Sequence, residues 1–261
     1  TVTVGQAADA KPAVKAELAM GAVQANHAID FVVNEGSTLT MQSLAVGTKE
    51  YTQRTAVAKG DTPATVTYVG NVEIKGNATV TEGITVAAGT ANQVAALTQT
   101  SGNLTAKSLT VAAAVEKDQK VTAQAGTFNQ TDGKLTVDTL TNGGTMTVKG
   151  TVVTNADSVN TGAINSYESK TGSLTIAGGT FTNGTMTFDK ITVADGATLK
   201  TGINLDGTAS FVVFQELDLQ KGSTLNINAL NAKSQVDGKE VEKADILKFT
   251  EGTVKLNGGA L

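Results

Sequence analysis

Cysteine and tryptophan are absent from this chain of 261 residues, and histidine occurs once, at His27. Without cysteine the chain has no disulfide, no thiolate zinc site and no cysteine nucleophile. A single histidine is too few for a multi-histidine metal centre, so we expect neither a metal nor a cofactor. No apolar run approaches the roughly 18 residues of a transmembrane helix, and we expect no membrane span.

Positive charge is also scarce. Charged residues make up 17% of the chain, the formal net charge is −4, and the only arginine is Arg54. Nucleic-acid binding needs clustered lysine and arginine side chains that neutralise phosphates. We therefore expect no nucleic-acid partner.

Threonine, glycine and asparagine dominate what is present. The 42 threonines, 28 glycines and 17 asparagines occupy 87 of the 261 positions. The apolar content of 40% argues against disorder, while aromatic residues make up only 4%. We expect a folded chain whose core is built from aliphatic side chains in thin layers.

A short phrase recurs five times along the chain. It consists of an apolar residue, a few polar residues, glycine, any residue, leucine or methionine, threonine and an apolar residue. Its glycines are Gly102, Gly133, Gly144, Gly172 and Gly184. Two pairs of these glycines, spaced by 11 and 12 residues, are offset from each other by 39 and 40 residues. The near-constant offset indicates duplication of a structural unit.

A second phrase aligns without gaps over residues 37–46, 102–111, 133–142 and 184–193. Apolar residues alternate with threonine on each side of a two-residue bend, which is typical of short strands with one buried face. The alternation predicts Leu104, Ala106, Leu109 and Val111 on the inner face, with Thr105 and Thr110 on the outer face. Asparagines at turns, including Asn142, Asn155, Asn183 and Asn204, are expected to stack and pair their amides.

The segments Leu140–Val148, Phe181–Phe188, Gly133–Asn142 and Ala194–Leu199 resemble repeats in the passenger regions of bacterial autotransporters and related large surface adhesins. The resemblance covers the chain from about Gly36 onward and concerns a repeat style. It implies a right-handed parallel β-helix exported across the outer membrane of a Gram-negative bacterium. It also implies a location at the cell surface or in the secreted fraction.

From these patterns we predict an all-β fold, a right-handed parallel β-helix (solenoid) with a short N-terminal cap. Residues 1–35 form the cap, residues 36–235 the solenoid repeats, and residues 236–261 a continuation that is cut short. Pro12 followed by Val14, Leu18 and Ala22 at four-residue steps indicates that the cap contains a short helix. A β-sandwich, which also has many short strands, is the alternative.

No catalytic residue is predicted. His27 has Asp30 nearby but no serine motif, so it is more readily a packing or surface histidine than a member of a triad. The aspartates that a glycosidase would need are scattered and mostly occupy turn positions. They are Asp132, Asp138, Asp189, Asp195, Asp206 and Asp218.

One stretch interrupts the repeats, between Gly47 and Tyr68. Insertions in repeat architectures emerge as loops on one face, and such loops often bind partners. We therefore predict that Tyr51, Arg54 and Tyr68 contact a partner.

The predicted function is that of a non-enzymatic, surface-displayed or secreted adhesin or rigid presentation scaffold that uses multivalent polar contacts. Its partner is a host or bacterial surface protein or glycan, and self-association is open. A polysaccharide-degrading enzyme and a pure structural stalk are the alternatives.

Overall fold

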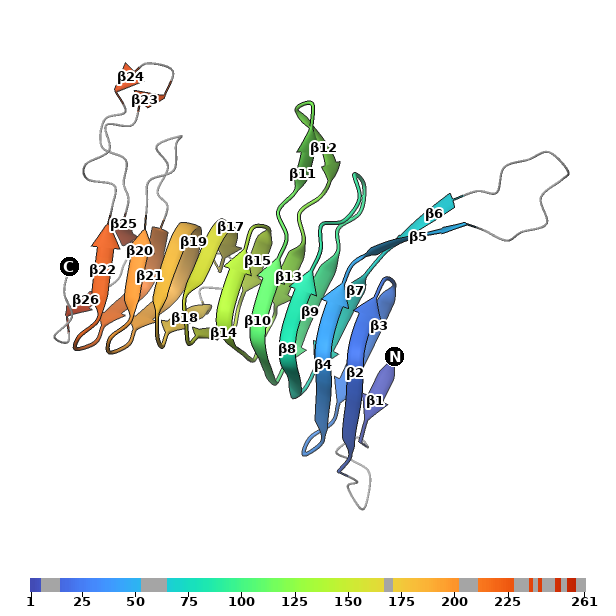
Figure 1. Cartoon of the computed structure of the whole chain (residues 1–261). Helices are drawn as coiled ribbons and strands as arrows, with labels where there is room; N and C mark the ends of the chain where they lie inside the picture. Colours follow the sequence, from blue (N-terminus) through green and yellow to red (C-terminus); the bar gives the residue numbers. More distant parts are fainter. Residues whose placement is uncertain are drawn as a thin grey trace, which may run out of the picture.

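The computed structural model describes residues 1–5, 15–52, 65–166, 171–201 and 211–227, and the short segments 235–236, 239–240, 247–249 and 253–256. All regular secondary structure in these residues is β-strand. The strands follow one another from the N-terminal to the C-terminal end of an elongated molecule (Figure 1). Most of them belong to a single 20-stranded sheet.

Parallel pairing organises this sheet into two ladders. The first ladder begins with β1 (Val2–Val4), β3 (Ala28–Val33), β7 (Asn71–Lys75), β9 (Ala96–Ser101), β13 (Thr127–Gln130) and β15 (Thr145–Val148). It continues through parts of β17 (Ser158–Asn165), β19 (Thr180–Val193) and β21 (Phe211–Leu219) to β25 (Leu247–Phe249). Each strand lies beside one that follows it much later in the sequence, as parallel pairing requires.

The second ladder begins with five nine-residue strands. They are β2 (Glu17–Ala25), β4 (Thr38–Val46), β8 (Ala78–Val86), β10 (Asn103–Val111) and β14 (Lys134–Asn142). After β14 the ladder divides into two columns. One runs through β16 (Thr151–Thr154), β18 (Ser173–Ile176), the ends of β19 and β21, and β26 (Thr253–Leu256). The other runs through the starts of β17 and β19 to β20 (Thr198–Thr201) and β22 (Thr224–Ile227).

In the residues that the structure describes, three antiparallel hairpins lie outside the large sheet. They are formed by β5 (Thr48–Thr52) with β6 (Thr65–Val69), β11 (Val115–Lys117) with β12 (Lys120–Ala123), and β23 (Gln235–Val236) with β24 (Lys239–Glu240). All other described pairings are parallel, so the strands are not arranged as the antiparallel layers of a β-sandwich.

The predicted fold class, a right-handed parallel β-helix with a helical cap, is wrong. The structure is all-β, and five parallel strands close into a ring in the order β14, β16, β18, β19 and β17. The ring closes because β14 and β19 are long enough to pair in both columns. The sequence pattern predicted a break between two short strands, whereas these strands run through the bend.

The prediction of a short helix in the N-terminal cap is also wrong. The residues from Glu17 to Ala25 form strand β2, in which Leu18 pairs with Leu39 and Met20 with Met41 of β4. A four-residue step is compatible with both periodicities, and pairing with β4 selects the two-residue period of a strand. Pro12 and Val14 lie outside the described residues.

The offset of about 40 residues between the glycine pairs spans two steps of a ladder. Lys134 pairs with Thr151, which pairs in turn with Ser173, 39 residues after Lys134. The duplicated segments are therefore next-but-one neighbours in the stack. Segments 103–111 and 134–142, by contrast, lie side by side in the gapless register that their sequences share.

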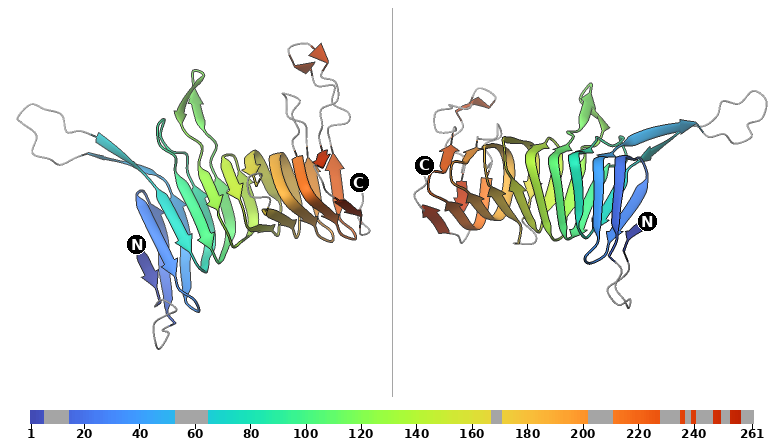
Figure 2. Two further views of the ribbon diagram at one scale, coloured as in Figure 1. Left: turned by 180° about the vertical axis from the view of Figure 1, so that it is seen from behind. Right: turned by 60° about the horizontal axis from the view of Figure 1, so that its bottom comes forward.

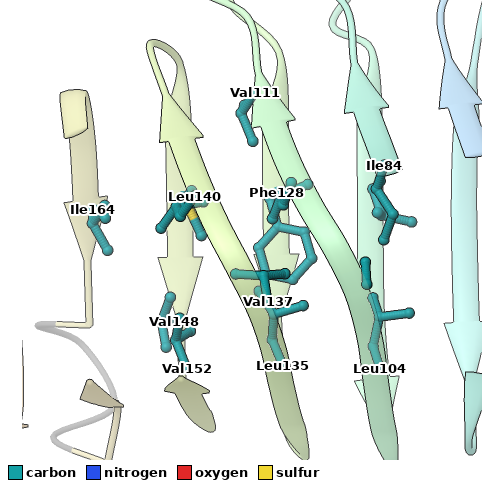
Figure 3. Packing of buried hydrophobic residues seen from close by; sticks show 14 of the residues in the cluster. Ile84, Leu104, Val111, Phe128, Leu135, Val137, Leu140, Val148, Val152 and Ile164 are labelled. Carbon is teal, nitrogen blue, oxygen red and sulfur yellow. The ribbon is translucent and has the colours of Figure 1, made fainter. Parts of the chain in front are cut away.

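The core consists mainly of alternate apolar residues from the strands of the large sheet. Leu104, Ala106, Leu109 and Val111 are all less than 5% exposed. Thr105 is exposed and Thr110 is partly exposed, which confirms the predicted inner and outer faces of this strand. Phenylalanines fill the largest spaces, and Phe128 packs among leucines and valines of the neighbouring strands (Figure 3).

A buried column of asparagines joins successive strands of the second ladder. Asn142 Nδ2 donates to Asn160 Oδ1 over 2.7 Å, and Asn160 Nδ2 donates to Asn183 Oδ1 over 3.0 Å. The predicted stacking is thus confirmed for Asn142 and Asn183. Exposed Asn155 instead donates to Asp138, and Asn204 lies outside the described residues.

Glycines at the turns permit close approach of successive backbones, and Gly133 provides a test. Its φ is 88°, and an added Cβ would fall against the carbonyl oxygen of Gly102. The left-handed conformation alone costs a substituted residue about 1–2 kcal/mol. We expect Gly133→Ala to lower the free energy of unfolding by more than this, measured by denaturant titration.

The matched control is Gly196→Ala. Gly196 has a φ of 73°, but an added Cβ there would have no atom within 4 Å. The loss of stability in Gly196→Ala should therefore measure the cost of the left-handed backbone conformation alone, without a steric clash. Equal losses in the two variants would contradict the close packing of Gly133 on Gly102.

Candidate interaction surface

Insertions leave the stack at one corner, where the chain passes from the second ladder to the first. Residues 47–70 connect β4 to β7, residues 87–95 connect β8 to β9, and residues 112–126 connect β10 to β13. The hairpins β5–β6 and β11–β12 therefore project from the same side of the molecule (Figure 2). We call these three connections the corner insertions.

The first corner insertion contains the residues that the sequence singled out. Tyr51 pairs with Val66 and Tyr68 with Lys49 in the β5–β6 hairpin. Tyr68 is 38% exposed, and its ring centroid lies 4.3 Å from that of His27, tilted by 44°. Arg54 lies outside the described residues. The structure thus places Tyr68 at the accessible base of the hairpin. Contact of Tyr51, Arg54 and Tyr68 with a partner stays a prediction.

Hydrogen bonds join the second and third corner insertions. The backbone N–H of Gly89 donates to the carbonyl of Gln124 over 2.8 Å, and the N–H of Gln124 donates to Thr90 over 3.0 Å. The side-chain amide of Gln124 also donates to the carbonyl of Ala91. These bonds hold the two loops together as one unit beside the stack.

A tight turn closes the third corner insertion. Asp118 and Gln119 have φ values of 52° and 60° between the paired residues Lys117 and Lys120. Two successive residues with positive φ are characteristic of the two-residue turns that suit the twist of a β-hairpin. The β11–β12 hairpin is therefore a defined element.

Exposed apolar side chains concentrate on the corner insertions. Tyr68, Val94 and Val115 are 38%, 45% and 51% exposed, one in each insertion. The other large apolar residue with comparable exposure among the described residues is Val159 of β17, at 41%. Sequence reasoning found Tyr68 but missed both valines, because an isolated valine in a polar loop carries no signal that distinguishes it from a strand residue.

The contacts of the single histidine and of its neighbour Asp30 are with other residues where they are seen. His27 is exposed and packs against Tyr68. Asp30 is also exposed, and its Oδ2 accepts a hydrogen bond from the Thr1 hydroxyl over 3.2 Å. Within the described ranges, no three His, Cys, Asp or Glu side chains are grouped as metal ligands would be.

Two of the scattered aspartates accept hydrogen bonds that stabilise turns or neighbouring strands. Asp132 Oδ1 accepts from the backbone N–H of Gly133 over 2.7 Å, a turn contact. Asp138 Oδ1 accepts from Asn155 over 3.2 Å. Asp189 and Asp218 lie in β19 and β21, Asp195 lies in the turn after β19, and Asp206 falls outside the described residues.

A shallow groove of about 270 Å³ lies on the outer face at the bend of β8, β10 and β14. Its lining comprises Thr79, Val80, Thr81, Thr105, Ala106, Lys107, Thr136, Asp138 and Asn155. Hydrolysis of a glycoside uses two carboxyl groups across the scissile bond, whereas Asp138 is the single carboxylate in this lining. The groove offers hydrogen bonds to a ligand but lacks that catalytic pair.

Comparison with known proteins gives no relative: no family model matches the chain, and neither a curated protein nor a solved structure is detectably similar. The resemblance to autotransporter passengers therefore rests on the repeat residues alone. In the part of the chain that the structure describes, no helix has the length and apolar character needed to cross a membrane.

Proposed function

We propose that this chain is a non-enzymatic presentation scaffold that binds a partner macromolecule through the corner insertions, in the manner of an adhesin. The observation that carries the proposal is the placement of Tyr68, Val94 and Val115. Each is exposed, and each occupies a different insertion at the same corner. Exposed apolar residues that gather on one side of a molecule mark interaction surfaces.

The ladders provide the rigidity that such a surface needs. The strands that precede the insertions, β4, β8 and β10, pair in parallel along most of their length. Adjacent strands lie about 4.8 Å apart, so successive insertions are presented at short, fixed steps. Several modest contacts can then act together and give an avidity that no single contact provides.

The partner that fits this surface is a protein or glycan at the surface of a host or bacterial cell. Apolar contacts from the tyrosine and valines would be accompanied by polar contacts from the charged β11–β12 hairpin, which carries Glu116, Lys117, Asp118 and Lys120. A location at the cell surface or in the secreted fraction follows from the resemblance in repeat style and belongs to the same proposal.

The test is a triple variant, Tyr68→Ser, Val94→Ser and Val115→Ser. Native protein is first screened on cells, immobilised matrix proteins and glycan arrays, and the variant is then measured on the ligands that bind. Loss of an interface anchor typically costs more than about 1 kcal/mol, so we expect the dissociation constant to rise at least about tenfold.

Val159→Ser is the matched control, because Val159 is equally exposed but belongs to strand β17. It should bind like the native protein. Unchanged binding by the triple variant would contradict the assignment to the corner. A native chain that binds no surface ligand would instead favour a structural stalk.

A further inference from the structure

The groove at the bend of β8, β10 and β14 is separate from the corner insertions, because no residue of the insertions lines it. Its volume of about 270 Å³ is close to the lower end of ligand pockets, which usually span roughly 300–1,000 Å³. It therefore suits one small molecule or one unit of a polymer. All three strands are paired on both sides, so an added peptide strand would find no free edge here.

A row of threonines lines the groove. Thr79 pairs with Thr105, and Thr105 pairs in turn with Thr136. Neighbouring strands lie about 4.8 Å apart, so the three side chains recur at that step. Threonine carries both a hydroxyl and a methyl group. The row can therefore exchange hydrogen bonds with a ligand and also contact its C–H groups.

A β-bulge in β8 shapes the bend at this point. Val80 and Gly83 are three positions apart but pair with Ala106 and Ser108, which are two positions apart. The pairing of β8 with β4 shifts at the same place. An added Cβ at Gly83 would clash with the hydroxyl of Ser108, so glycine permits the close approach of the two strands. Bulges are over-represented beside active sites, where they redirect a side chain.

Two opposite charges line the groove without pairing. Lys107 stands opposite Asp138 in the register of β10 and β14, yet among the described residues no ion pair joins them. The nearby carboxylate of Glu82 instead accepts a hydrogen bond from Gln42 of β4 over 2.9 Å. Asp138 Oδ1 accepts from Asn155, and Oδ2 has no partner in the described part of the chain. The ammonium group and one carboxylate oxygen are thus available to a ligand.

We propose that this groove binds one unit of a neutral carbohydrate. The charges of Lys107 and Asp138 cancel, which favours a neutral ligand, whereas a phosphate would need clustered positive charge. The carboxylate accepts hydrogen bonds from sugar hydroxyls, the ammonium group donates to sugar oxygens, and the threonine hydroxyls do both. No aromatic side chain is part of this lining, so we expect affinity in the millimolar range. The inference goes beyond the proposed function and does not depend on the corner insertions.

Two-dimensional ¹H–¹⁵N NMR of the native protein tests the site. The probes are the methyl glycosides of glucose, galactose, mannose and N-acetylglucosamine, with inorganic phosphate for comparison. At least one glycoside should shift the backbone amide signals of Thr105, Lys107 and Asp138 along a saturable curve. The proposal would be overturned if every glycoside left these signals unchanged, if the shifts lay in the corner insertions alone, or if phosphate bound more tightly than each glycoside.

Substitution of the two charged residues tests their contacts with the sugar. Asp138→Asn removes the negative charge but keeps an acceptor for Asn155, and Lys107→Met removes the ammonium group. Hydrogen bonds to charged groups are the stronger ones, so each variant should raise the dissociation constant at least about tenfold. The matched controls are Asp132→Asn and Lys134→Met, whose exposed side chains do not line the groove.

The controls should bind the glycoside like the native protein. Denaturant unfolding of each variant checks that the fold is retained. Native affinity in both Asp138→Asn and Lys107→Met, or an equal loss in the controls, would overturn the assignment of the site to this groove.

Discussion

Replacement of Phe128 by alanine is expected to lower the free energy of unfolding by about 3–5 kcal/mol. Phe128 lies in β13, is fully buried, and stands in register between Leu97 of β9 and Met146 of β15. Its ring fills the space between the two ladders (Figure 3). Alanine would leave a cavity that the flanking strands cannot close, because backbone hydrogen bonds fix their separation.

Denaturant titration followed by circular dichroism measures this loss. The control is Thr105→Ala, since Thr105 is an exposed residue of β10 and surface substitutions usually change stability by no more than about 0.5 kcal/mol. A loss below about 1 kcal/mol for Phe128→Ala would mean that the core collapses around the missing ring. It would contradict a rigid spacing of the ladders.

Replacement of Asn160 by alanine is expected to cost roughly 2–4 kcal/mol, because each buried polar group that loses its partner costs about 1–3 kcal/mol. The substitution removes the acceptor for Asn142 and the donor to Asn183. It also removes the bond from Asn160 to the carbonyl of Thr185. All three asparagines are at least 95% buried, so water does not readily replace these contacts.

A double-mutant cycle isolates the pairing of the amides. Asn142→Ala, Asn160→Ala and the double variant are compared by denaturant unfolding, with exposed Asn155→Ala as the matched control. We expect the double variant to lose less stability than the sum of the single variants, since the second substitution removes a group that the first has already left without its partner. Additive losses would contradict a coupled column.

The alternation of apolar and polar residues was sufficient to predict the inner and outer faces of β10, because the two-residue period of a strand is local and visible. The pairing of asparagine amides was predicted from turn positions, and it missed Asn160, which bonds to both Asn142 and Asn183 from within the strand ladder. The helix predicted near Leu18 failed because four-residue spacing fits either periodicity. Only the long-range pairing with β4 decides between them.

The repeats did not predict that five strands of the sheet close into a ring. A ten-residue phrase satisfies the same alternation whether it breaks into two short strands or continues through the bend. In β14 the strand continues, and its two halves pair with β16 and β17. The exposure of Val94 and Val115 was equally hidden, because it depends on where the ladders begin and end around each insertion.

At the corner between the ladders, the length of a connection does not affect the register of the strands that it joins. After β14 the chain crosses through Gly143 and Gly144, whereas after β10 it crosses through residues 112–126. The flanking strands remain paired in parallel in both cases. Connections of very different length at this corner are therefore compatible with the same aliphatic core, so their length and sequence can vary while the pairing of the framework is kept.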